Sequence, residues 1–387
     1  IETAISGSSW IRKMFEAGDS LKAIHGADNV YDFSLGNPNV EPPESFAAIL
    51  KETVAAAGRR DHGYPPNAGY LDVRESIAAH VSTEQQSGLS GQEIIMTCGA
   101  AGALNVILKA ILDPEDEVIT PAPYFVEYNA YAANHGGVLR SVSTHPDFSL
   151  NIDAISAAIT GKTKAVLINS PNNPTGQVYT AESLAKLGAL LDERSKALNR
   201  TIYLISDEPY RKIVYDGTRV PSLFTCYRES LVATSYSKDL SIPGERIGFL
   251  AVNPAATYRE DLLNAMTLAN RILGYVNAPA LMQRVVGALQ GQQVDISEYA
   301  RKRELICKGL AACGYEFTRP AGAFYLFPRT PIPDDVEFVR LLQEKLILVV
   351  PGSGFGGPGH FRIAFCVDDN TIKNAMPGFR DVMAPFK

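Results

Sequence analysis

The sequence predicts an α/β protein: a large domain with a mainly parallel central sheet flanked by helices, and a smaller α+β domain. The first observation is that short apolar runs alternate with longer amphipathic stretches through the middle of the chain. Such alternation is typical of parallel sheets covered by helices on both faces. The second is a change of pattern after about Val285, where a long charged stretch precedes short, separated strand-like runs. A length of 387 residues is enough for two domains.

The strands of the large domain are expected at residues 93–98, 117–120, 165–169, 202–206, 231–234 and 247–252. Between them, the stretches 103–112 and 181–198 have the spacing of apolar residues that a helix needs to cover a sheet. No internal repeat or low-complexity tract interrupts this region. We therefore expect a large domain over residues 42–287.

The smaller domain is expected to combine the two ends of the chain. Its predicted helices are 296–312 and 334–344, and its predicted strands are 322–327 and 360–365. Residues 31–35 also have the pattern of a strand, ahead of a Pro-rich connector. The smaller domain would then contain residues 1–41 and 288–387.

The composition excludes several classes of protein. With 46% hydrophobic residues, 20% charged residues and a net charge of −6, the chain has no basic surface for nucleic acid or for an anionic membrane. No apolar run reaches the roughly 18–20 residues that a membrane span needs. Residues 1–18 mix charged and apolar residues, unlike a signal peptide, and the start at Ile1 indicates a trimmed or incomplete N-terminus.

The cysteines are odd in number and widely separated, without the spacing of metal ligands: Cys98, Cys226, Cys307, Cys313 and Cys366. This scatter predicts reduced thiols in a cytoplasmic protein, and neither a disulfide framework nor a metal site.

The segment 235–248 carries the most informative chemistry. Lys238 follows an expected strand, and a lysine at the end of a buried strand can be desolvated enough to become a neutral, nucleophilic amine. The hydroxyls of Ser235 and Ser237 and the guanidinium of Arg246 would suit a phosphate beside it. This combination indicates a lysine that holds pyridoxal phosphate as a Schiff base. A lone lysine in such a loop is more often an exposed residue, so the prediction depends on the other loops.

Ligands of open α/β sheets bind beyond the carboxyl ends of the strands. Asp207 and Tyr210 follow one expected strand, and Asn173 follows its predecessor in the chain. A buried carboxylate would keep a pyridine nitrogen protonated, and Tyr210 and Asn173 could hydrogen-bond the phenolate oxygen of the same ring, which lowers the pKa of the imine. The alternatives are a helix N-cap or turn for Asp207 and a plain turn around Asn173.

Two further features suit anions. Gly99, Ala100, Ala101 and Gly102 begin a helix, and their small side chains leave backbone N–H groups open to a phosphate, although such turns usually serve packing. Arg362 lies in an apolar run, where a guanidinium is costly to bury unless an anion meets it. A substrate α-carboxylate has the matching bidentate shape, and a structural salt bridge is the alternative.

These residues, in this order, resemble the class I/II aminotransferases of the fold-type I pyridoxal phosphate enzymes, the aspartate and aromatic aminotransferase group. The resemblance runs from the motif at 34–38 to the motif at 361–363, nearly the whole chain. It implies the fold-type I architecture with a small domain that closes on substrate. It also implies an amino-group exchange between an L-amino acid and a 2-oxo acid, by a ping-pong mechanism through aldimine and quinonoid stages on pyridoxal phosphate.

The resemblance assigns catalytic roles to three residues. Lys238 would hold the cofactor and then act as the base, Asp207 would pair with the pyridine nitrogen, and Tyr210 would bind the phenolate oxygen together with Asn173. The implied phosphate site consists of Gly99, Ala100, Ala101, Ser235 and Arg246.

The remaining implied contacts concern the cofactor ring, the substrate and a second subunit. Phe125 would stack on the ring, and Gly36, Asn173 and Arg362 would hold the α-carboxylate of the substrate. Tyr64 matches a tyrosine that reaches the phosphate of the neighbouring subunit, which implies a homodimer with shared active sites.

Two departures from the family pattern bear on the substrate. Members specific for dicarboxylates carry a second cation, either a lysine where this chain has Ala101 or an arginine from the partner subunit, which aligns with Leu273. Arg271 is the alternative cation. A lost charge-assisted pair is worth about 1.5–3 kcal/mol, so neutral or aromatic amino acids should be favoured, with aspartate still possible. Phe355 and Tyr124 could form apolar walls or belong to the core.

Two other functions compete with transamination. A carbon–sulfur β-lyase of the same fold would share these motifs and expel a β-substituent. A pyridoxal phosphate-binding sensor domain of a transcription regulator would need a basic DNA-binding domain. About 40 residues precede the expected cofactor domain and the chain is acidic, which disfavours the sensor.

Overall fold

A seven-stranded sheet forms the centre of the computed structural model, which describes residues 10–58 and 60–387. Its strand order is β2-β8-β7-β6-β5-β3-β4. The strands are β2 (Ile94–Thr97), β3 (Glu117–Ala122), β4 (Val138–Ser143), β5 (Thr163–Asn169), β6 (Tyr203–Asp207), β7 (Ser230–Ser235) and β8 (Gly248–Val252). Strand β8 runs opposite to the other six strands and is antiparallel to both of its neighbours, so the predicted mainly parallel sheet is confirmed.

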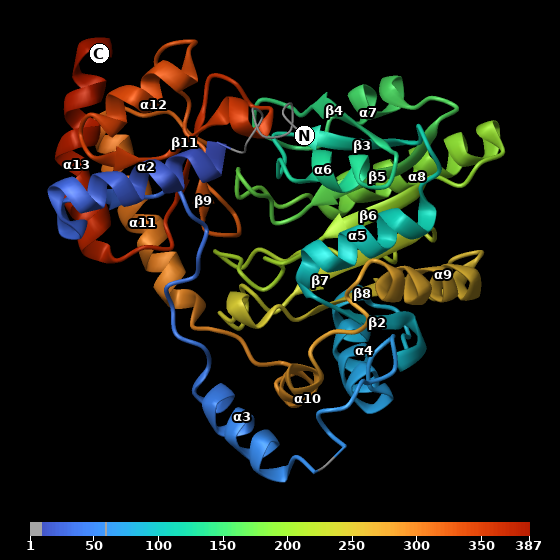
Figure 1. The fold of residues 1–387 in the computed structure, drawn as a ribbon. Helices are drawn as coiled ribbons and strands as arrows, with labels where there is room; N and C mark the ends of the chain where they lie inside the picture. Colours follow the sequence, from blue (N-terminus) through green and yellow to red (C-terminus); the bar gives the residue numbers. More distant parts are fainter. Residues whose placement is uncertain (1–9, 59) are drawn as a thin grey trace.

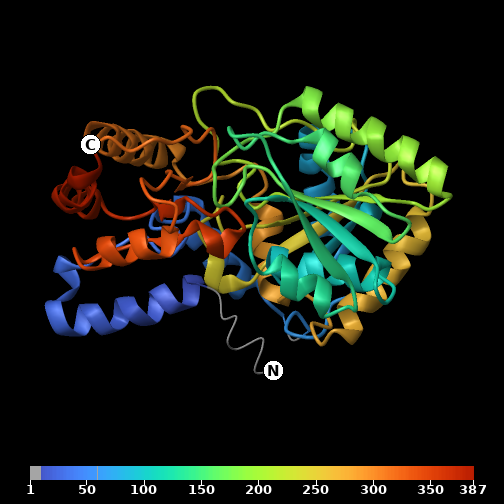
Figure 2. The same ribbon diagram turned by 90° about the horizontal axis from the view of Figure 1, so that it is seen from above.

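The helices around this sheet are α4 (Leu71–Gln85), α5 (Gly99–Ile111), α6 (Tyr128–Ala133), α7 (Ile152–Ala158), α8 (Ala181–Leu198), α9 (Arg259–Ile272) and α10 (Ala280–Ala288). They cover both faces, as Figures 1 and 2 show. Val166 and Ile168 of β5 pack in one apolar cluster with residues of α4, α7, α8 and α10. Ala165 and Leu167 point to the opposite face and pack with α5, α6 and α9. Successive side chains of a strand alternate between faces, which explains why its whole sequence is apolar.

A separate apolar cluster lies in the C-terminal part of the chain. Its elements are α11 (Ile296–Cys313), β9 (Tyr325–Leu326), α12 (Asp335–Gln343), β10 (Ile347–Leu348), β11 (Val350–Pro351), β12 (Phe361–Ala364) and α13 (Asp369–Met383). From the N-terminal part, α2 (Trp10–His25) and β1 (Tyr31–Asp32) join them through Met14 and the pairing of β1 with β10. Figure 1 shows this group beside the central sheet. The boundaries after residues 41 and 287 stay predictions, and residues 1–9 of the predicted arm lie outside the described residues.

The predicted elements differ from the observed ones in two respects. The strands expected at 31–35, 322–327 and 360–365 are shorter, because β1, β9 and β12 pair over only two to four residues. The unpredicted elements are strands β4, β10 and β11 and helices α2, α3 (Glu44–Ala56), α4, α6, α7, α9, α10 and α13. Strand β4 lies at the edge of the sheet and is largely exposed, so its sequence lacks the apolar run of a central strand.

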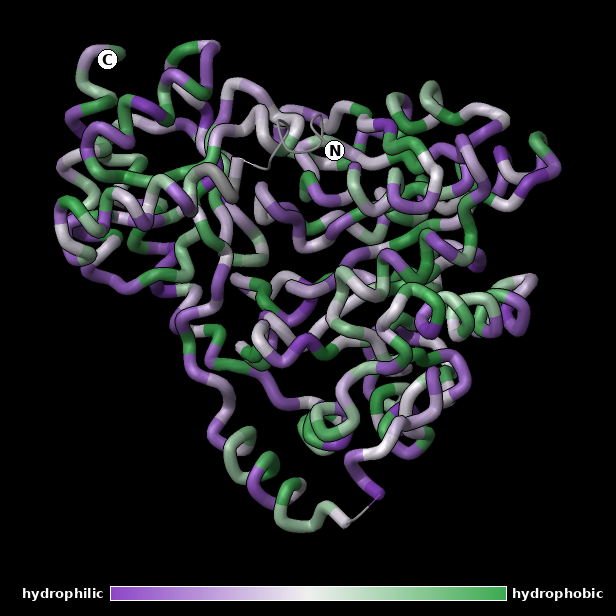
Figure 3. The backbone as a smooth tube through the Cα atoms, viewed as in Figure 1, coloured by the Kyte–Doolittle hydropathy of each residue, from purple (hydrophilic) through white to green (hydrophobic). Residues whose placement is uncertain are grey.

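One helix extends away from the rest of the chain. Helix α3 (Glu44–Ala56) has no buried residue and contacts mainly α10 (Figure 1). Hydrophobic residues nevertheless occur along it, as Figure 3 shows. Within residues 10–58 and 60–387, none of the helices has the length and apolar character to cross a membrane.

Candidate active site

The largest set of predicted site residues meets in one cavity of about 430 Å³. We call it the central cavity. Its lining includes Gly36, Ala100, Ala101, Phe125, Asn173, Asp207, Tyr210, Ser235, Lys238, Arg246 and Arg362. The carboxyl ends of β5, β6 and β7 and the loops after them supply Asn173, Asp207, Tyr210, Ser235 and Lys238, as the parallel arrangement of these strands requires. Gly36 comes from the N-terminal part and Arg362 from β12, so the cavity lies between the sheet and the C-terminal group of elements.

Lys238 is a half-buried residue of the central cavity and not an exposed surface lysine. Its Nζ donates a hydrogen bond to the backbone oxygen of Gly36 at 2.8 Å and lies 5.7 Å from the centre of the Phe324 ring. The pKa of the Lys238 amine is lowered to about 8, mainly by burial; Cys366 opposes this shift, and the nearby charges of Arg362 and Arg246 contribute to it. A substantial fraction of the amine is therefore neutral near pH 8, which is the form that attacks a carbonyl.

Asp207 is buried at the end of β6 with one oxygen unsatisfied. The hydroxyl of Tyr128 donates to Oδ2 at 2.6 Å, whereas Oδ1 has no hydrogen-bond partner among the described residues. The pKa of this carboxyl is raised to about 7, mainly by burial; the hydrogen bond from Tyr128 opposes the rise, and Glu208 adds to it. A buried carboxylate oxygen without a partner fits a protonated pyridine nitrogen, which would satisfy it and lower that pKa.

The N-terminus of α5 and Arg246 form an anion-binding corner of the cavity. Helix α5 begins at Gly99 without a side-chain cap, so its first N–H groups are open to a ligand. Gly99 itself does not line the cavity. Its φ of 73° favours glycine, and a Cβ there would lie 3.0 Å from Nη2 of Arg246. Ser235 lines the same wall.

Arg362 is 2% exposed and has no carboxylate partner within the described part of the chain. Its guanidinium lies between the rings of Tyr325 and Phe355, at 4.9 and 4.7 Å from their centres. Nη1 donates to Oδ1 of Asn173 at 3.1 Å, and Nε has no partner. The alternative of a structural salt bridge is thus not supported, and an incoming carboxylate would complete the hydrogen bonding of this arginine.

Tyr210 and Gly36 meet at Tyr325, a residue that the sequence did not single out. The hydroxyls of Tyr210 and Tyr325 lie 2.8 Å apart. A Cβ on Gly36 would overlap the Tyr325 hydroxyl, so only glycine fits there. Tyr325 therefore contacts both Tyr210, which is expected at the phenolate oxygen, and Gly36, which is expected to hold the substrate.

Other residues were also missed. Tyr128 lies three residues after the predicted site residue Phe125, but its hydrogen bond to Asp207 joins positions that are 79 residues apart in sequence. Asn169 accepts from the backbone of Asn173 and donates to the backbone of Asp207, which holds two predicted site residues together. Glu127 and Tyr131 also line the cavity. No local sequence pattern distinguishes these residues from others in strands and turns.

Several predicted residues lie away from the central cavity of their own chain. Tyr64 is 89% exposed. Arg271 is exposed at the end of α9, and Leu273 packs against the core. Phe355 is fully buried and contacts Arg362 from outside the cavity lining. Tyr124 is hydrogen-bonded to Asn129. The contribution of Tyr64 to a partner's site stays a prediction.

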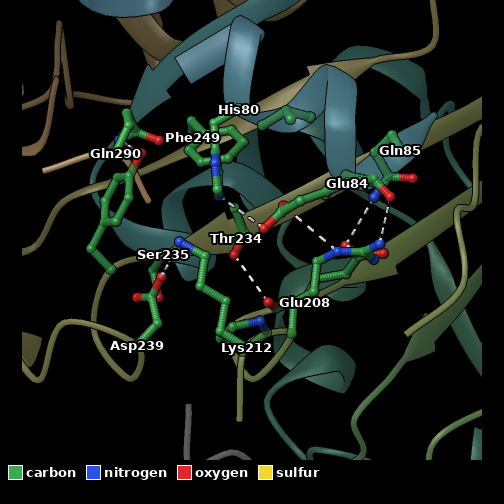
Figure 4. Close-up of a pocket in the computed structure, with 15 residues that line it drawn as sticks. His80, Glu84, Gln85, Glu208, Lys212, Thr234, Ser235, Asp239, Phe249 and Gln290 are labelled. Carbon is green, nitrogen blue, oxygen red and sulfur yellow. Dashed lines mark hydrogen bonds and ion pairs between the residues drawn. The ribbon is translucent and has the colours of Figure 1, made fainter. Parts of the chain in front are cut away.

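A smaller charged pocket lies directly beside the central cavity, sharing Pro209 and Ser235 with it. Figure 4 shows its polar groups: His80, Glu84, Glu208, Lys212 and Asp239. Nζ of Lys212 lies 3.3 Å from Oδ2 of Asp239, the neighbour of Lys238. Arg211 binds Oε2 of Glu208 at 2.9 Å. The pocket thus surrounds three buried or partly buried carboxylates with two permanent cations.

Lys212→Met is expected to destabilise the protein. Burial raises the pKa of Asp239 and the charge of Lys212 opposes this effect, so removal of the lysine leaves a buried carboxylate uncompensated. We expect the free energy of unfolding to fall by about 3 kcal/mol, measured by urea denaturation at pH 7.5. Lys186→Met, which removes an exposed pair with Glu182, is the matched control and should leave the midpoint unchanged. Equal effects of both changes would contradict this role of Lys212.

Comparisons with known proteins agree with the geometry. A family model described as aminotransferase class I and II matches residues 28–378. The aspartate/prephenate aminotransferase of Thermus thermophilus is 32% identical over 361 residues, which cover 90% of each chain. The aromatic-amino-acid aminotransferase 2 of Thermococcus litoralis is 31% identical over 396 residues, covering 97% of this chain and 95% of the relative.

Two solved structures extend the comparison to the fold. An amino transferase from Eubacterium rectale has a TM-score of 0.95 at 40% identity, over 97% of this chain and 96% of the other. The aspartate aminotransferase from Thermus thermophilus with maleate has a TM-score of 0.86 at 29% identity, over 97% and 96%. The predicted fold-type I architecture is confirmed.

Proposed function

This chain belongs to the aminotransferase class I and II family, and we propose that its central cavity exchanges an amino group between an L-amino acid and a 2-oxo acid with pyridoxal phosphate bound to Lys238. The observation that carries this proposal is the pairing, in one cavity, of a lysine with a lowered pKa and a buried carboxylate with an unsatisfied oxygen. Each group has a hydrogen bond, but neither has an ion-pair partner among the described residues that would explain it as a structural feature.

The residues present fit the cofactor. When bound, pyridoxal phosphate supplies an electrophilic carbonyl and a ring that accepts electrons from the substrate's α-carbon. Asp207 would hold the ring nitrogen protonated, and Tyr210 and Asn173 would bind the phenolate oxygen. Phe125 lines the cavity where a ring would stack. The N-terminus of α5, Ser235 and Arg246 would bind the phosphate.

Lys238 has two tasks in this proposal. Its neutral amine would hold the cofactor covalently. With substrate bound, the same Nζ would take the proton from the substrate's α-carbon and later return it. A pKa of about 8 suits both tasks, because the amine can bind and release a proton near neutral pH.

Recognition of the substrate's α-carboxylate falls to Arg362, supported by Asn173 and the backbone at Gly36. Nε of Arg362 has no hydrogen-bond partner among the described residues, and the rings of Tyr325 and Phe355 flank the guanidinium group. Beyond this arginine, no lysine stands at position 101, where Ala101 lines the wall. We therefore infer a preference for neutral or aromatic amino acids over dicarboxylates.

We also infer a homodimer with shared active sites. Tyr64 presents an aromatic ring to solvent, and α3 extends from the chain with apolar residues and no buried side chain. Both features suit contact with a second copy of this chain. A cytoplasmic location remains an inference from the scattered cysteines.

A half-reaction tests the proposed function. Protein loaded with pyridoxal phosphate is mixed with single amino acids, and the visible absorbance of the cofactor is followed. Neutral or aromatic amino acids should abolish the visible band, and a 2-oxo acid should restore it. Release of pyruvate from cysteine or cystathionine, without consumption of a 2-oxo acid, would contradict transamination and favour the β-lyase. Fast conversion of aspartate would overturn the inferred preference and implicate Arg271.

A further inference from the structure

Glu127 is the acidic residue of the central cavity to which the proposed reaction gives no role. It lies between Phe125 and helix α6 and lines the cavity together with Lys238 and Arg362. Its Oε2 is buried and has no hydrogen-bond partner in the described part of the chain. Although it occupies the N-cap position of α6, its side chain does not cap that helix.

A carboxylate in this position is unfavourable in the free protein. Burial raises the pKa of Glu127, and a hydrogen bond from its own backbone N–H and the positive charge of Arg362 only partly oppose this effect. No ion pair within residues 10–58 and 60–387 involves Glu127. Buried carboxylates are normally paired or hydrogen-bonded, so an unpaired one that faces a ligand cavity is a candidate recognition group.

The charged residues that line the cavity can be divided into those that the cofactor would occupy and those that remain for the substrate's side chain. The cavity's cations are Lys238, Arg246 and Arg362, and its carboxylates are Asp207 and Glu127. In the proposed function, Lys238 binds the cofactor's carbonyl carbon, Arg246 its phosphate and Arg362 the α-carboxylate of the substrate. Asp207 pairs with the ring nitrogen. Glu127 alone among these five groups then faces the part of the substrate that differs between amino acids.

We propose that Glu127 is a specificity-determining residue that selects amino acids with a positively charged side chain, such as lysine or ornithine. This proposal rests on the proposed function and narrows its substrate class: cationic amino acids rank above the neutral and aromatic ones, which in turn rank above dicarboxylates. An ω-ammonium group would satisfy Oε2 with a charge-assisted hydrogen bond, while a distal carboxylate would be repelled by the same group. The aliphatic stem of such a substrate suits the apolar lining residues Leu104 and Phe125.

The first test uses binding and needs no turnover. The compound 6-aminohexanoate is lysine without its α-amino group, and hexanoate is the matching carboxylate without the ω-ammonium group. Both compounds are titrated, in a calorimeter, into the protein as purified and loaded with the pyridoxamine form of the cofactor. We expect the Kd of 6-aminohexanoate to be about 10- to 100-fold lower than that of hexanoate, and Glu127→Gln to remove this difference.

The second test compares lysine with norleucine in the half-reaction. Glu127→Gln should lower the second-order rate constant of the half-reaction with lysine by about 10- to 100-fold. It should change the rate constant with norleucine by less than about threefold and raise the one with glutamate. Glu245→Gln is the matched control, because Glu245 is exposed beside Arg246 and does not line the cavity. It should keep the preference for lysine.

The outcomes separate this inference from the proposed function. If no amino acid removes the visible band of the wild-type protein, the proposed function fails. If norleucine and lysine react equally well, or if Glu127→Gln slows both equally, transamination stands and the selection by Glu127 is wrong. A wild-type protein that binds both hexanoates with the same Kd would overturn it as well.

Discussion

Replacing Lys238 by alanine is expected to abolish turnover, with a loss of about 10⁴-fold or more in kcat. The amine is the nucleophile that holds the cofactor and the base that moves the substrate's α-proton, and no other lysine lines the cavity among the described residues. The Lys238→Ala protein should still bind pyridoxal phosphate, because Asp207, Arg246 and the N-terminus of α5 remain. Its absorbance should be that of the free aldehyde.

A lysine outside the cavity provides the control for this experiment. Lys109 is exposed near the other end of α5, so Lys109→Ala makes the same chemical change at a distance from the site. It should leave kcat and the absorbance unchanged. Near-normal activity of Lys238→Ala, measured as 2-oxo acid formation, would refute the assignment of Lys238.

Asp207→Asn should produce the second largest loss, about 10²-fold or more in kcat. Asparagine keeps the shape and can still accept a hydrogen bond from Tyr128, but it cannot carry the negative charge that keeps a pyridine nitrogen protonated. We expect the binding of pyridoxal phosphate to raise the Tm of the wild-type protein more than that of Asp207→Asn. Equal shifts in Tm would contradict the pairing of Asp207 with the cofactor.

The same substitution should stabilise the cofactor-free protein at alkaline pH. Burial raises the pKa of Asp207 from 3.8 to about 7. Between these pH values the folded protein keeps a proton that the unfolded chain has released, so the free energy of unfolding falls as the pH rises through this window. Asparagine has no proton to lose. Above pH 7, the free energy of unfolding of cofactor-free Asp207→Asn should exceed that of the wild type by up to about 4 kcal/mol. Near pH 4 the two free energies should be equal.

The sequence predicts best those parts of the fold that are buried on both sides. Helix α8 has the bounds expected from its apolar spacing, and β5, β6 and β7 coincide with continuous apolar runs. Strand β4 was missed because an exposed edge strand needs no apolar run. The short strands β1, β9 and β12 form where distant segments pair, and the length of such a pairing is set by the partner strand.

In the candidate site, residue types at strand ends were predictable and their partners were not. Lys238, Asp207 and Asn173 follow strands whose carboxyl ends meet at one edge, so their convergence follows from the predicted sheet. The hydrogen bond from Tyr128 to Asp207 and the approach of Tyr325 to Tyr210 join segments 79 and 115 residues apart. The unsatisfied oxygen of Glu127 is an absence of contacts, which no sequence pattern records.

Reduction of the cofactor-loaded protein with borohydride, followed by mass spectrometry of its peptides, tests the central claim most directly. This treatment makes a Schiff base between a lysine and pyridoxal phosphate permanent. The account predicts a single labelled peptide, with the pyridoxyl phosphate on Lys238, and no label in Lys238→Ala. A label on another lysine, such as Lys212 in the adjacent charged pocket, or a protein without any label would contradict it.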